Sequence, residues 1–149
     1  MNIEIAGLVK LEQEMDKIAA DLHGEPFLKA MRSAAMLVAN DAKKNAPVDV
    51  GRLRASITPT VRVQGTAVLG VVGSNVVHSA PVEYGSVPHW PPIRALETWS
   101  RRHGIDTFLV ARKIATKGIK EVRFLRNAME SNKDAIVDLL GNAVKRIVE

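Results

Sequence analysis

The chain has 149 residues, no cysteine and a formal net charge of +5 at pH 7. This length suits one compact body with one core, so we expect a single domain over residues 1–149. The lack of cysteine excludes disulfide bonds and thiolate metal ligands. The N-terminal residues are acidic where a signal peptide would be basic, and no apolar run approaches the roughly 20 residues that span a bilayer. These features predict a protein made in the cytoplasm and not embedded in a membrane.

Charge is distributed unevenly along the chain. Residues 1–25 contain six acidic and two basic residues, whereas residues 92–126 contain nine basic and three acidic residues. A basic region of this kind suits nucleic acid, an acidic partner protein, or the acidic face of another copy of the same chain. Composition alone leaves these alternatives open.

Two amphipathic helices are predicted in the first third of the chain. Apolar residues recur at steps of three or four from Ile5 to Leu22, which places them on one face of a helix. A second helix is predicted from about Pro26 to Ala46. Proline suits the first helical turn, and Pro47 disfavours helical geometry at the residue before it.

The stretch KNAPVDVGRLRASI, residues 44–57, connects this helix to the next element. Pro47 ends the helix, and Asp49 is expected to accept hydrogen bonds from the backbone N–H groups just ahead of it. Gly51 is expected to adopt a positive φ, which other residues avoid. The stretch therefore predicts a sharp helix-to-strand turn in a basic setting.

A β-hairpin is predicted next. Apolar and polar residues alternate from Leu53 to Val63, and Pro59 marks this strand as an edge strand or a bulged one. Gln64–Thr66 is expected to turn into a second strand that ends near residue 73. A further short extended segment is expected around residues 76–77. A two-stranded hairpin is marginal in water, so helices must cover it or a neighbouring copy must add strands.

Helices dominate the remainder of the chain. Apolar spacing predicts one helix from Ile93 to the glycine at 104, one from Asp106 to the glycine at 118, and one over residues 136–147. The order of elements predicts an α+β domain, with a small antiparallel sheet (a hairpin at about 53–73) packed against N-terminal and C-terminal helices. Residues 90–120 would form a helical insertion within it.

No group of residues predicts catalysis. His78, Glu83 and His89 are spaced by five and six residues, which matches no recognised metal site, so we expect them in a solvated loop. No nucleophile elbow or phosphate-binding glycine motif is present. We therefore expect no enzymatic activity, no cofactor and no metal.

The stretch VEYGSVPHWPP, residues 82–92, is unusual for its prolines and aromatic residues. Four prolines between residues 81 and 92 stiffen a loop that carries Tyr84 and Trp90. A stiff aromatic loop loses little entropy on docking and suits an interface, although Trp90 could equally cover the domain's own core. The nearby basic segment lacks a helix-turn-helix or zinc-finger pattern, and the chain has too few aromatic residues for a single-strand stacking platform.

The order of several short motifs resembles a known family. AKKNAPVDVGRLRASI is followed by VGS, VEYGS, WPPIRALETWSRRHGI, ARKIATKGI and RFLRNAMESNKDAI, spanning about residues 30–136. This series resembles the neck, head–tail joining and tail-completion proteins, including minor tail proteins, of long-tailed bacteriophages. The resemblance implies a non-enzymatic structural protein of the virion, assembled in the cytoplasm of the bacterial host.

In that family, the implied role is a homomeric ring that joins the tail to the DNA-filled head. Six subunits are favoured and twelve are the alternative. The implied partners are other copies of the chain, a head-completion or connector protein, and a tail-tube or terminator protein, while genomic DNA would pass through the lumen without sequence-specific contact. A tail-terminator or other minor tail role is a variant of this hypothesis. A small basic nucleic-acid-binding domain is the alternative from a different class.

The hypothesis names a set of interface residues. The acidic first helix and the basic later helices are candidate surfaces between subunits. Gly51 would set the corner of each subunit, and the arginines after it would face a neighbour. The full set of interface candidates is Asp49, Gly51, Arg52, Arg54, Tyr84, Trp90, Arg101 and Arg102.

Overall fold

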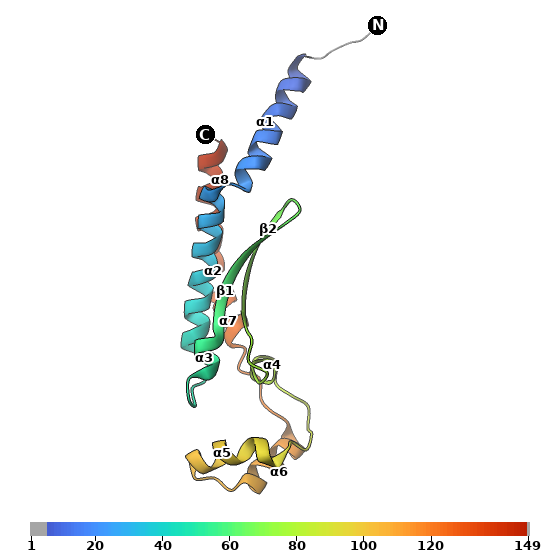
Figure 1. Ribbon diagram of the computed structural model, residues 1–149, viewed down its shortest axis with the longest axis vertical. Helices are drawn as coiled ribbons and strands as arrows, with labels where there is room; N and C mark the ends of the chain where they lie inside the picture. Colours follow the sequence, from blue (N-terminus) through green and yellow to red (C-terminus); the bar gives the residue numbers. More distant parts are fainter. Residues whose placement is uncertain (1–5, 149) are drawn as a thin grey trace.

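A computed structural model of the chain (Figure 1) describes residues 6–148, and the side chains of residues 13–148. A long helix and a curved hairpin lie side by side, the last two helices pack on that helix, and a pair of helices extends from one end. In chain order the elements are α1 (Ala6–Leu22), α2 (Glu25–Asn45), α3 (Arg52–Ser56), β1 (Ile57–Gln64), β2 (Ala67–Ser74), α4 (Ser79–Tyr84), α5 (Ile93–His103), α6 (Thr107–Lys117), α7 (Phe124–Ser131) and α8 (Lys133–Val148). Within the described residues, no helix is long and apolar enough to cross a membrane.

Helix α2 is the centre of the fold, because it contacts both strands and also α7 and α8. Its buried face is made of small side chains, and Ala39 and Ala42 are almost fully excluded from solvent. Small residues let neighbouring backbones approach closely. Ile57 of β1 and Phe124 of α7, both fully buried, fill the space beside this face. The predicted end of α2 is confirmed, since Ala46 is its C-terminal cap in extended geometry.

The two strands form an antiparallel hairpin with a two-residue turn. Gln64 pairs with Ala67, and Gly65 has a φ of +59° at the first turn position, as a type II′ turn requires. The α+β class with its small sheet is confirmed. Pro59 pairs with Val72 in a sheet of two strands, so the prediction that it lies in an edge strand is also confirmed.

Two predictions about this region are wrong. The strand begins at Ile57 rather than Leu53, because Arg52–Ser56 forms the short helix α3. Leu53 and Ile57 are both buried and lie four residues apart, a spacing that suits a helical turn as well as an alternating strand. No third extended segment forms at residues 76–77, where the chain makes a turn into α4.

Helices α5 and α6 pack mainly on each other and form what we call the arm, residues 87–118 (Figure 1). Their predicted boundaries are confirmed. Gly104 ends α5 in a left-handed conformation, and the side chain of Asp106 accepts a hydrogen bond from the Leu109 N–H at the start of α6. Helix α1 contacts α2 and α8, and it projects from the opposite end of the long axis. The apolar stripe predicted for α1 begins at Ile5, which lies outside the described residues.

Candidate assembly surfaces

The loop between α2 and α3, residues 46–51, combines a glycine in the left-handed conformation with exposed apolar side chains. Gly51 has a φ of +79°, as predicted, and nothing lies within 4 Å of where a Cβ would be. The backbone conformation alone therefore favours glycine there. Val48 and Val50 are 54% and 56% exposed, so the loop presents two valines to solvent.

Asp49 of this loop connects the body to the arm. The Arg102 Nε donates to Asp49 Oδ1 at 3.1 Å, and the Arg102 Nη2 donates to the second carboxylate oxygen. The His103 Nε2 lies 4.0 Å from Asp49 Oδ1, and the His103 ring stacks on Trp99 with centroids 4.2 Å apart. The prediction that Asp49 accepts nearby backbone N–H groups is wrong: among the described residues, its carboxylate instead accepts two charge-assisted hydrogen bonds from the Arg102 guanidinium. This contact holds the far end of α5 close to the α2–α3 loop.

The other three predicted arginines make no ion pair with any described residue. Arg52 and Arg101 are exposed and have no ion-pair partner within the part of the chain that the structure describes. The Arg54 Nη2 makes a long contact of 3.4 Å to the Ala46 carbonyl oxygen. Of the four arginines predicted at the interface, Arg102 is thus the one that makes an ion pair with another described residue.

The chain leaves the body for the arm and returns to it at one tight crossing. Ser86 and Ile119 exchange two backbone hydrogen bonds of 2.9 and 3.1 Å. Gly85 and Gly118 flank this pair with φ values of +75° and +69°. A Cβ at Gly118 would lie 2.0 Å from the Ser86 carbonyl oxygen, so a side chain there would force the two segments apart. We call this crossing the base of the arm.

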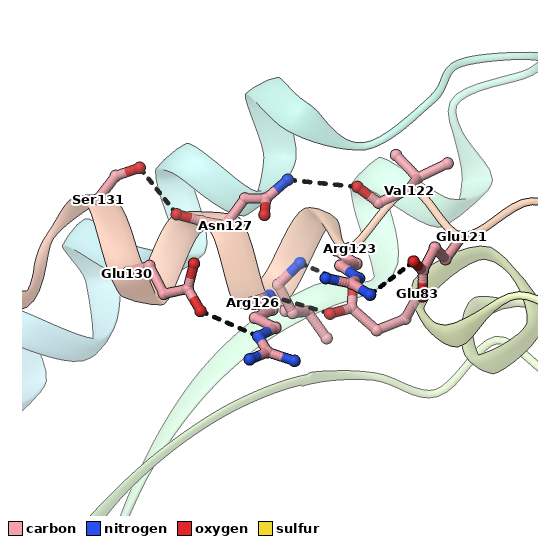
Figure 2. Close-up of polar contacts among 9 residues, drawn as sticks. Glu83, Glu121, Val122, Arg123, Arg126, Asn127, Glu130 and Ser131 are labelled. Carbon is pink, nitrogen blue, oxygen red and sulfur yellow. Dashed lines mark hydrogen bonds and ion pairs between the residues drawn. The ribbon is translucent and has the colours of Figure 1, made fainter.

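The surroundings of Glu83 differ from those predicted from the sequence. This residue was expected in a solvated loop, yet it is only 3% exposed, and its carboxylate caps α7. Its two oxygens accept hydrogen bonds from the backbone N–H groups of Leu125 at 2.8 Å and Arg126 at 3.0 Å (Figure 2). A carboxylate at a helix N-terminus satisfies otherwise unpaired donors and interacts favourably with the helix dipole. Arg123, just before α7, has a φ of +55° and donates its N–H to the Glu83 carbonyl oxygen.

The other two candidate metal ligands do not join Glu83. His78 is exposed, and His89 Nδ1 lies 2.9 Å from the Val87 carbonyl oxygen. Among the residues that the structure describes, no group of three His, Asp or Glu side chains could hold a metal ion.

An apolar groove of about 500 Å³ opens between α2, β2, α4, α7 and α8. Its walls are mostly aliphatic and methionine side chains, and Tyr84, which is 77% exposed, stands beside it. Tyr84 is therefore exposed beside the groove, and its role as an interface residue stays a prediction. The side chains on the groove walls include Met31, Ala35, Val38, Val72, Leu125, Met129 and Ile136.

The arm has an exposed surface that is both apolar and basic. Trp90 is 54% exposed and packs edge-on against Phe108, which is 55% exposed, with ring centroids 5.8 Å apart. Trp90 does not belong to the buried cluster at the centre of the fold. Large apolar side chains at this level of exposure on a small helical pair are typical of an interaction surface. The exposed set in the arm is Val87, Trp90, Ile93, Ile105, Phe108 and Leu109.

Residues 9–85 match the sequence model of a bacteriophage family described as "Bacteriophage HK97-gp10, putative tail-component". The match covers more than half of the chain, including α2, the α2–α3 loop, the hairpin and α4. The chain therefore belongs to this bacteriophage tail-component family, and the resemblance to phage tail proteins is confirmed. No curated protein and no solved structure matches the chain.

Proposed function

We propose that the protein is a structural subunit of the virion that forms a ring at the head–tail junction and joins the tail to the DNA-filled head. The observation that carries this proposal is membership of the phage tail-component family through residues 9–85. The proposal includes the absence of catalysis and a location in the neck or tail of the particle.

The shape and charge of the subunit support a ring. Helix α1, which contains four acidic and two basic residues, and the basic arm lie at opposite ends of the long axis (Figure 1), so the subunit presents two different surfaces. Contacts between two different surfaces are heterologous, and they generate rings when the rotation between neighbours closes. The partners would be five further copies in a six-subunit ring, or eleven in the alternative, together with head-completion or connector and tail-tube or terminator proteins.

Particle imaging and genetics together test the proposal. Phage lacking this gene should accumulate DNA-filled heads and separate tails, and supplying the protein should restore joined particles. The purified protein, alone or bound to tails, should appear as a closed ring by native mass measurement and electron microscopy. A protein that is monomeric both alone and in assembled particles would refute the ring.

Two outcomes would select the other hypotheses. Tails of irregular length in the mutant would indicate a terminator role within the tail. Tight binding of duplex DNA that weakens steeply with salt would favour the nucleic-acid-binding domain, because such binding rests on phosphate contacts and counterion release.

A further inference from the structure

The arm carries several cations that make no ion pair with any described residue. Residues 87–118 contain six basic and two acidic residues, and one of these acids, Asp106, caps α6. Arg102 pairs with Asp49, but the other five basic side chains make no ion pair with any described residue. These five exposed cations are Arg94, Arg101, Arg112, Lys113 and Lys117.

Apolar side chains lie beside these cations on α6. Phe108 and Arg112 are four residues apart, as are Leu109 and Lys113, so each pair shares a helix face. All four side chains are exposed. A partner that matches this surface must offer negative charge together with apolar side chains. A duplex nucleic acid would meet the cations but would leave Phe108 and Leu109 without apolar contacts.

Helix α1 offers the complementary chemistry. It contains four acidic and two basic residues, and its apolar residues follow a helical spacing in the sequence. Met15 is 62% exposed, and the neighbouring Asp16 is exposed and has no ion pair with a described residue. The helix contacts α2 and α8 and then extends beyond them (Figure 1). An amphipathic helix with an exposed apolar side chain needs a further surface to bury it.

The two surfaces cannot meet within one chain, because α1 and the arm lie at opposite ends of the long axis (Figure 1). We infer that the arm of one subunit binds α1 of a second copy, with acidic side chains of α1 facing Arg112 and Lys113 and apolar side chains packing on Phe108 and Leu109. The contact is heterologous, so each subunit uses its arm toward one neighbour and its α1 toward the other. This contact adds a specific pair of surfaces to the proposed function. It depends on that function only in the claim that such contacts close into a ring.

Paired charge reversals test this contact. One variant, R112E/K113E, reverses the arm, and another, E12K/D16K, reverses two acidic positions of α1 that are four residues apart. Each variant alone should associate about 3- to 10-fold more weakly at low salt, because exposed ion pairs contribute about 0 to 1 kcal/mol each and 1.4 kcal/mol is a tenfold change. Sedimentation velocity over a range of protein and salt concentrations measures the change.

Mixing the two variants gives the sharper result. A reversed arm can bind a reversed α1, and a native arm can bind a native α1, so an equimolar mixture should recover wild-type association in alternating order. The variant that carries all four reversals should also recover. K145E/R146E, which reverses two adjacent exposed cations of α8, is the matched control and should associate like the wild type.

The remaining outcomes separate the inference from the proposed function. If the mixture does not recover wild-type association, the two surfaces do not bind each other. If the wild-type protein shows no self-association at low salt, the contact does not form. Rings unaffected by the reversals would leave the proposed function standing without this contact. Association rescued by mixing, but without closed rings, would keep the contact and refute the ring. If R112E/K113E instead abolishes binding of a short DNA duplex and leaves self-association unchanged, the arm binds nucleic acid and the inference is wrong.

Discussion

Removing the Glu83 carboxylate should destabilise the subunit well beyond the effect of an ordinary surface mutation. Glu83 is 3% exposed and accepts two backbone N–H groups at the N-terminus of α7. Glu83→Ala leaves both donors without a partner, and each buried unsatisfied group costs about 1–3 kcal/mol. We expect the free energy of unfolding to fall by about 3 kcal/mol, which lowers Tm by roughly 6–12 °C for a protein of this size.

Glu83→Gln separates the charge from the shape of the side chain. The amide keeps one acceptor oxygen but turns its NH2 group toward the second N–H donor, and it removes the favourable interaction with the helix dipole. We expect a loss of about 1–2 kcal/mol. Glu130→Gln is the control on the same helix, because it breaks only the exposed contact with Arg126 and should cost about 0.3–0.5 kcal/mol.

Urea denaturation followed by circular dichroism measures all three variants under the same conditions. The reasoning would be refuted if Glu83→Ala were no more destabilising than Glu130→Gln, since the carboxylate would then not hold α7. Glu83→Gln with wild-type stability would show that the charge contributes nothing and that one acceptor suffices.

Two further predictions concern Asp41 and the arm. Hydrogen bonds from Lys44 and Asn132 hold the pKa of Asp41 below its usual range, so its contribution to stability is present above about pH 4 and is lost as the pH falls through the lowered value. Asp41→Asn should therefore be less stable than the wild type at pH 7, with a difference that shrinks toward pH 3 in urea titrations; a difference independent of pH would contradict this. Replacing residues 87–118 with an Asn-Gly turn between Ser86 and Ile119 should leave a body that unfolds cooperatively, because these two residues already exchange backbone hydrogen bonds. Loss of cooperative unfolding would show that the arm is not an insertion but part of the body.

Local signals predicted the elements whose boundaries depend on neighbouring residues. Pro47 ends α2, Gly51 takes a positive φ and Asp106 caps α6, each through effects within a few residues of itself. The start of β1 was misplaced because the spacing of Leu53 and Ile57 fits both a helical turn and a strand, and packing against α2 decides between them.

The polar contacts that organise the subunit were not predictable from local pattern. Glu83 binds α7 from 42 and 43 positions away in sequence, and Asp49 binds Arg102 from 53 away. Nothing in the spacing of residues identifies partners at such a separation. The ordered series of motifs pointed to the right protein family, but the role of Glu83 required the arrangement of the elements in space.

The crossing at the base of the arm also determines how freely the length of the chain between Ser86 and Ile119 can change. The two segments meet at Ser86 and Ile119, so apart from the Asp49–Arg102 contact the arm affects the stability of the body mainly through the entropy of closing that loop. Closure entropy grows only slowly with length, and doubling a loop costs about 0.6 kcal/mol. Residues 87–118 are therefore a place where insertions, deletions or exchanged segments should be tolerated by the fold. A subunit built this way can acquire a different binding surface on its arm while α2, the hairpin and α7 keep the same packing.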